Sequence, residues 1–125
     1  MNISSVETYL DSIFNGKLSD HVFYDGRPPT TDDSWNSFVV VDCGNSISDM
    51  NAYGRGTVLV MLYTKPTKAG TKNVAEAQRL EKTLNAILAG QSDSHYHVSR
   101  RTTYTDYDET FGLHCNIVIL DLIVL

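Results

Sequence analysis

The sequence has little cysteine, little proline and few basic residues. It contains 2 cysteines and 3 prolines in 125 residues, and 10 basic residues against 15 acidic ones give a formal net charge of −5. Proteins that bind a nucleic-acid backbone usually carry an excess of basic residues, so this composition argues against direct nucleic-acid recognition. Cys43 and Cys115 each lie in an apolar, strand-like segment. We expect two small buried thiols rather than a disulfide.

The sequence also lacks a long apolar run. Its most apolar stretch, Asn116–Leu125, is too short to span a bilayer and carries Asp121 near its middle. Residues 1–5 lack the basic start of a signal peptide. We therefore expect a soluble protein that stays inside the cell that makes it. A length of 125 residues is usual for one domain, so residues 1–125 are expected to fold as a single unit.

The central element of the predicted fold is a helix over Asn73–Ala89. Its apolar residues recur at spacings of three and four, which places them on one stripe. They are Val74, Ala77, Leu80, Leu84, Ile87 and Leu88. We expect Asn73 to cap the first turn and Glu76 to complete a capping box. Gly90 is expected to end the helix in a left-handed conformation.

The remaining elements follow from capping signals and from alternating or β-branched segments. They are a helix from Ser4 to about Phe14, a short strand His21–Tyr24, a hairpin of Ser37–Cys43 and Tyr53–Tyr63 joined by a turn-rich Gly44–Ala52, and a second hairpin of Tyr96–Tyr104 and Leu113–Leu125. This order predicts an α+β domain with a mainly antiparallel sheet of four to five strands and two helices packed on one face.

The strand around Tyr96–Tyr104 is polar on both sides. Tyr96, Val98, Arg100, Thr102 and Tyr104 alternate with the residues between them, so we expect these five on one face. Two polar faces are typical of an edge strand or an interface arm. Imidazoles are zinc ligands, so His95, His97 and His114 are the residues on which a metal site could be built. Exposed or interface histidines are the favoured interpretation.

Asp121 needs a partner, because burying an unpaired carboxylate costs on the order of several kcal/mol. Arg55, Arg100 and Arg101 are the available cations. An ion pair within the chain is favoured over one across a subunit boundary. No serine lies in a Gly-x-Ser-x-Gly elbow, and neither cysteine has the polar surroundings of a reactive thiol. We therefore predict no catalytic activity and no cofactor.

Several segments of the sequence follow one another in an order that can be compared with that of known proteins. VFYDGRPP at Val22–Pro29 is followed by FVVV at Phe38–Val41, by VLVMLYTK at Val58–Lys65 and by the helix that begins at an asparagine. With the closing hairpin, this arrangement resembles the tail-terminator and tail-completion proteins of long-tailed bacteriophages and prophages. The resemblance implies a small subunit that assembles into a ring, commonly a hexamer, and it brings no catalytic residues.

The resemblance further implies partners in the tail tube and among the head-completion proteins, and a location in the host cytoplasm during assembly and then in the virion tail. The working parts would then be surfaces. Because Arg and Tyr are favoured at interface hot spots, we select polar and aromatic candidates. They are Arg55, Tyr53, Tyr96, Arg100, Arg101, Tyr104 and Asp121. The alternatives are a non-catalytic adaptor with a groove between the polar hairpin and the helix, and a metal-dependent enzyme.

Overall fold

The computed structural model describes residues 3–24, 34–43, 48–50, 53–91, 93–109 and 111–125. Its elements, in chain order, are α1 (Ile3–Phe14), β1 (Val22–Tyr24), β2 (Ser37–Asp42), β3 (Ser48–Met50), β4 (Tyr53–Thr64), α2 (Val74–Ala89), β5 (Tyr96–Asp108) and β6 (Leu113–Val124). The strands form one sheet in the order β1-β2-β4-β6-β5, and β3 pairs with β4 outside this path. Among the strands of the described residues, β1 and β2 are the one pair that runs parallel. The predicted α+β class with a mainly antiparallel sheet is confirmed.

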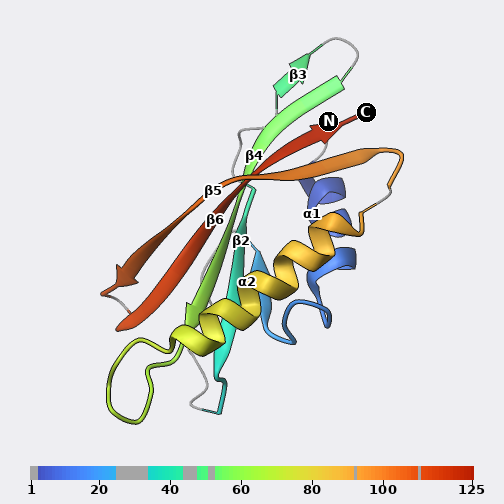
Figure 1. Ribbon diagram of the computed structural model, residues 1–125. Helices are drawn as coiled ribbons and strands as arrows, with labels where there is room; N and C mark the ends of the chain where they lie inside the picture. Colours follow the sequence, from blue (N-terminus) through green and yellow to red (C-terminus); the bar gives the residue numbers. More distant parts are fainter. Residues whose placement is uncertain (1–2, 25–33, 44–47, 51–52, 92, 110) are drawn as a thin grey trace.

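The long strands β4 and β6 form the middle of the sheet. Val58 faces Leu120 and Val60 faces Val118 across this pair. β5 pairs with the other side of β6 and is the last strand of the sheet. Figure 1 shows the β5–β6 hairpin, orange and red, crossing the molecule and reaching past the N-terminal end of α2. The apolar terminal strand β6 is therefore a central strand, with β4 on one side and β5 on the other.

One face of the sheet, called the helical face here, carries a buried cluster to which both helices contribute. Leu10 and Phe14 of α1 and Leu80 and Leu84 of α2 pack with apolar strand residues. These strand residues are Val39, Val41, Val58, Val60, Leu62, Val98, Val118, Leu120 and Leu122. The side chains of β4 alternate between the two faces, because Leu59, Met61 and Tyr63 pack with the cluster on the opposite face.

The opposite face, called the outer face here, carries a smaller and more aromatic cluster. Phe38, Val40, Tyr63, Cys115 and Ile117 are buried in it. Phe38 and Tyr63 stack with their ring centroids 4.7 Å apart, and the Phe111 ring meets both edge-on. Cys43 belongs to the helical-face cluster, and both cysteines are buried and unoxidised, as expected.

The sequence prediction of α2 is mostly confirmed. Asn73 Oδ1 accepts the backbone N–H of Glu76, which is the expected cap, but the Glu76 carboxylate accepts from Arg79 Nε. The stripe begins one turn later than predicted, since Val74 is 52% exposed. The prediction that Gly90 is left-handed was wrong. Gly90 has φ −87°, and its N–H donates to the Ala86 and Ile87 carbonyls.

Two further details differ from the expectation. β3 lies in the segment that was predicted as turns only, and residues 44–47 and 51–52 of that segment are outside the described residues, as are Arg27-Pro28-Pro29. The register of β5 shifts between Arg100 and Thr102. Because one residue is inserted at this bulge, the faces exchange beyond it. Thr102 and Tyr104 therefore lie on the outer face, not on the face of Tyr96, Val98 and Arg100.

Candidate functional site

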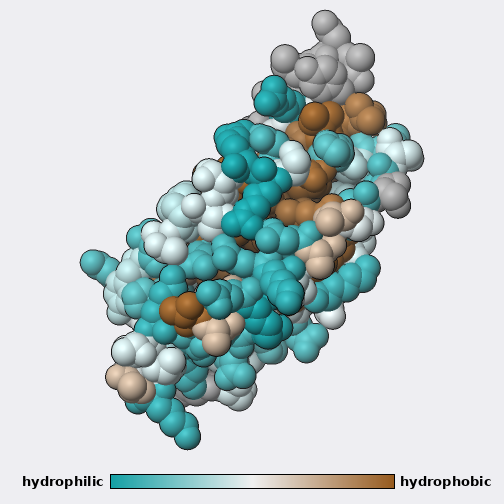
Figure 2. Space-filling view, viewed as in Figure 1, coloured by the Kyte–Doolittle hydropathy of each residue, from teal (hydrophilic) through white to brown (hydrophobic). Residues whose placement is uncertain are grey.

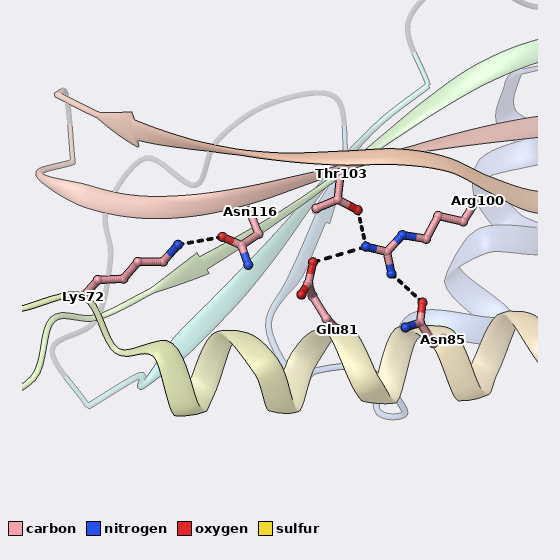
Figure 3. A network of polar contacts seen from close by, with 6 residues as sticks. All are labelled: Lys72, Glu81, Asn85, Arg100, Thr103 and Asn116. Atoms are coloured by element: carbon pink, nitrogen blue, oxygen red, sulfur yellow. Dashed lines mark hydrogen bonds and ion pairs between the residues drawn. The ribbon is translucent and has the colours of Figure 1, made fainter.

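Polar side chains join α2 to the edge of the sheet on the helical face. Arg100 Nη1 donates to Asn85 Oδ1 at 2.7 Å, and Arg100 Nη2 lies 3.4 Å from Glu81 Oε1 and also bonds Thr103 Oγ1 (Figure 3). Glu81 and Asn85 are four residues apart and so share one side of the helix. The guanidinium of Arg100, which was selected as an interface candidate, is thus engaged within its own chain.

A second contact on this face fixes the loop before α2. Lys72 Nζ donates to Asn116 Oδ1 at 3.1 Å (Figure 3). Asn116 is only 7% exposed, and an amide at such a position needs a partner. Together with Arg100, Lys72 bridges the space between α2 and the β5–β6 hairpin. The groove predicted there for an adaptor is therefore crossed by side chains.

Arg101 and Asp121 form an ion pair on the outer face. Arg101 Nη2 bonds Asp121 Oδ1 and lies 3.4 Å from Thr57 Oγ1. The hydrogen bond from Arg101 lowers the pKa of the Asp121 carboxyl, and the charge of Arg55 lowers it further. The favoured prediction, a partner within the chain, is confirmed. The bulge makes this pair possible, because it lets Arg101 face Asp121 while Arg100 faces α2.

The other aromatic candidates have different surroundings. Tyr96 stacks on Tyr9 of α1 with ring centroids 4.3 Å apart, so it belongs to the edge of the core. Tyr104 faces Ile117 across the β5–β6 pair and is 47% exposed. The side chain of Tyr53 lies outside those that the structure describes.

On the outer face, β4 and β6 carry a strip of half-buried apolar side chains with polar neighbours, which we call the outer patch. It comprises Leu59, Met61, Ile119 and Ile123, bordered by Arg55, Arg101, Asp121 and Tyr104. Leu59 faces Ile119 and Arg55 faces Ile123, so the members lie side by side on β4 and β6. An apolar strip with Arg and Tyr at its border has the composition of a protein interface.

The three histidines do not converge. His97 faces Ile123 near one end of the hairpin, whereas His114 faces Tyr107 at the other. The two positions lie nine residues apart along β6, a distance of roughly 30 Å at strand spacing, and His95 precedes β5. Within the described ranges, no three His, Cys, Asp or Glu side chains are grouped closely enough to hold a metal ion.

A cleft opens on the side where α1 ends. Its volume is about 390 Å³, and it lies between residues 16–21, residues 34–37 and the first turns of α2. The His21 and Trp35 rings stack in its wall, 4.2 Å apart. Lys17, Asp20, Glu76 and Arg79 bring both signs of charge to it. No pattern in the sequence indicated this cleft, because its walls are separate loops.

The residues that bond to the predicted candidates were not themselves predicted from the sequence. Glu81, Asn85, Lys72 and Asn116 were not selected, although they hold the hairpin against α2. The sequence did contain one indication of these partners. Glu81 and Asn85 are four residues apart on an amphipathic helix, so they share one side of it, from which they can reach the edge of the sheet. Tyr63 is buried in the outer-face cluster, and its hydroxyl donates to Asp108 Oδ2 at 3.0 Å.

Two further observations concern membrane-spanning helices and similarity to known proteins. None of the helices in the described part of the chain combines the length and the hydropathy required to cross a bilayer. Comparison with known protein families finds no family that matches the chain, and comparison with curated proteins finds no similar sequence.

Proposed function

We propose that the chain is a structural subunit of a bacteriophage or prophage tail, a tail terminator or neck-completion protein that forms a ring at the end of the tail tube. The resemblance of its sequence phrases and element order to that family motivates the proposal. The observation that carries it is the outer patch, in which Leu59, Met61, Ile119 and Ile123 are only half-buried beside Arg55 and Tyr104. Such a strip suits contact with another subunit.

The patch is well placed for this role because the two helices contribute to the cluster on the other face. A closed ring needs two different surfaces on each subunit, since its contacts are heterologous. The outer patch would supply one surface. The end of the β5–β6 hairpin, with Tyr107 49% exposed, would supply the other. Tail-tube and head-completion proteins would then contact the two ends of the ring.

Sedimentation velocity over a wide concentration range tests this proposal. We expect a species much larger than a dimer, with a ring visible by negative-stain electron microscopy. Arg55→Glu should remove the ring by reversing a charge beside the patch, while Lys82→Glu, on the exposed side of α2, should keep it. A wild-type chain whose largest species is a monomer or dimer at every concentration would contradict ring assembly.

A non-catalytic adaptor is the second candidate, and the cleft beside His21 and Trp35 is the observation that favours it. Mixed charges over a stacked aromatic pair suit a short polar peptide segment. Binding of a peptide library to the monomer, lost in Trp35→Ala but kept in Arg55→Glu, would support the adaptor. Absence of binding at millimolar peptide would exclude it.

A further inference from the structure

The edge of the sheet formed by β5 has the properties of a strand that pairs with another chain. β5 has 13 residues and lies at the end of the strand order, where β6 is its one neighbour among the strands that the structure describes. An edge strand presents a row of backbone N–H and C=O groups, and proteins usually protect it with Lys, Pro or bulges. The bulge at Arg101 interrupts only the first part of β5. The part after it, Thr102–Asp108, contains no Lys, Pro or Gly.

The direction of the backbone groups in this segment follows from one hydrogen bond. The N–H of Tyr107 donates to the side-chain Oδ1 of Asp106 at 2.8 Å, so this amide points away from β6. Amide directions alternate along a strand. The N–H groups of Thr105 and Thr103 therefore point to the same outer edge. Three amides spaced two residues apart are the pattern that an added antiparallel strand bonds.

We propose that Thr102–Asp108 of β5 pairs antiparallel with the same segment of a second copy of this chain, with Thr105 facing Thr105 on the two-fold axis. This register pairs all seven residues after the bulge. It places Thr103 opposite Tyr107, Tyr104 opposite Asp106 and Thr102 opposite Asp108. The outward amides of Thr103, Thr105 and Tyr107 then face one another.

Charge and side-chain type favour this register over its neighbours. No carboxylate faces a carboxylate in it, and the facing pairs include Thr with Thr and Thr with Tyr, which stabilise antiparallel sheets. Arg101 comes opposite Glu109 at the end of the segment. Shifting the axis to Asp106 would place Asp106 opposite Asp106, and shifting it to Tyr107 would place Asp106 opposite Asp108 twice. Like charges in facing positions oppose both alternatives.

Asp106 has a second role in this contact. Its carboxylate occupies the N–H of Tyr107, and the partner's backbone carbonyl must displace it before pairing. Asp106 therefore limits the strength of association and protects the edge against uncontrolled strand addition. Asp106→Thr removes this competition and keeps a residue that favours strands, so it should lower the Kd of the dimer. A Kd that is unchanged or raised would contradict the assigned pairing.

Cross-linking tests the register directly. Facing residues of an antiparallel pair have Cα atoms about 4.5–5.5 Å apart, which a disulfide can join. Under mild oxidation, Thr105→Cys should form a covalent dimer on the axis. Ser99→Cys, equally on β5 but before the bulge, should not. The native Cys43 and Cys115 are buried and do not compete. Equal cross-linking at both positions would overturn the proposal.

Charge reversal tests the same axis in solution. Thr105→Lys or Thr105→Glu alone places like charges in facing positions and should weaken the dimer about tenfold or more. An equimolar mixture of the two should restore it, which a merely misfolded variant could not do. Melting curves by circular dichroism check that each variant folds. A mixture that remains monomeric, or a wild type that is monomeric at millimolar concentration, would refute the pairing.

The contact goes beyond the proposed ring and can be separated from it. A two-fold contact closes a dimer, whereas a ring uses heterologous contacts. Arg55→Glu should leave the Thr105→Cys cross-link intact even where it abolishes the ring. Because Tyr104 and Tyr107 belong to both proposed surfaces, the effect of Thr105→Lys on the dimer is measured in the Arg55→Glu background, where the ring is absent, so the two hypotheses can still fail independently.

Discussion

At the scale of single residues, Tyr24 shows how burial shapes the response to pH. Its hydroxyl donates to Asp11 Oδ1 at 2.8 Å, and burial, followed by this bond, raises its pKa well above the usual range. The folded state therefore keeps the neutral phenol, and Tyr24 contributes its full stability below about pH 10. As pH rises above 10, the unfolded chain ionises first and stability falls.

Tyr24→Phe should flatten this alkaline loss. Below pH 9 the variant should be less stable by about 1 kcal/mol, because the bond to Asp11 is gone. Its free energy of unfolding should then fall less steeply than that of the wild type between pH 10 and 11. Urea titrations at fixed pH measure both effects. Tyr9, whose pKa burial also raises, leaves a residual slope in both proteins. Parallel slopes would contradict the assignment.

The ion pair of Asp121 gives a second prediction at this scale. Arg101 lowers the pKa of the Asp121 carboxyl, so the pair stabilises the fold above about pH 4 and this contribution is lost as pH falls. Arg101→Met should raise that pKa toward its ordinary value in an NMR titration of the carboxyl carbon. Arg100→Met is the matched control, because Arg100 faces α2 instead. Equal shifts in both variants would contradict the assignment of the pair.

At the scale of elements, two glycines that end their segments differ in backbone conformation. Gly112, in the turn between β5 and β6, has φ +67°, whereas Gly90 after α2 has φ −87°. An added Cβ at Gly90 would lie 3.4 Å from the Ala86 carbonyl oxygen, an ordinary contact. Of these two glycines, Gly112 is the one that needs the conformational freedom of glycine.

Gly112→Ala should destabilise the protein by about 1 kcal/mol or more, because the left-handed conformation strains a side chain. Gly90→Ala should be within about 0.5 kcal/mol of the wild type, since no strain is introduced. Denaturant midpoints at constant slope compare the two. A larger loss at Gly90 would indicate that α2 ends in the left-handed conformation expected from the sequence.

The sequence predicted those elements whose periodicity is set by burial. The stripe of α2 and the alternation of β4 are regular because each meets a core on a defined side. β3 was missed because Ser48–Met50 is short and carries no apolar alternation. The bulge in β5 was missed because both faces there are polar, so inserting one residue leaves no irregularity in the pattern.

The candidate site could be predicted from the sequence only in part. Opposite charge identified Arg55, Arg100 and Arg101 as possible partners of Asp121, and Arg101 is the residue that pairs with it. The contacts of Arg100 with Glu81 and Asn85 depend on how α2 lies against the sheet, and one sequence does not contain that distance. Figure 2 shows that the exposed surface of α2 is mostly hydrophilic, while apolar side chains gather near the C-terminus, where Leu125 is 63% exposed.

At the scale of the whole molecule, the sheet should open from its edges. β4 and β6 are paired on both sides, whereas β5 is paired on one side and β1 has three residues. Backbone amides of β4 and β6 should exchange hydrogen most slowly, close to the rate set by global unfolding. Hydrogen-exchange mass spectrometry at micromolar concentration measures this order. Faster exchange in β6 than in β5 would contradict the observed strand order.

The placement of the two thiols has a practical consequence. Cys43 belongs to the helical-face cluster and Cys115 to the aromatic cluster on the outer face, and both are shielded from reagent in the native state. Each face of the sheet therefore contains one cysteine, and alkylation of that cysteine reports when its face becomes accessible. Comparing their labelling rates in mild denaturant would reveal whether the helices detach before the strands separate.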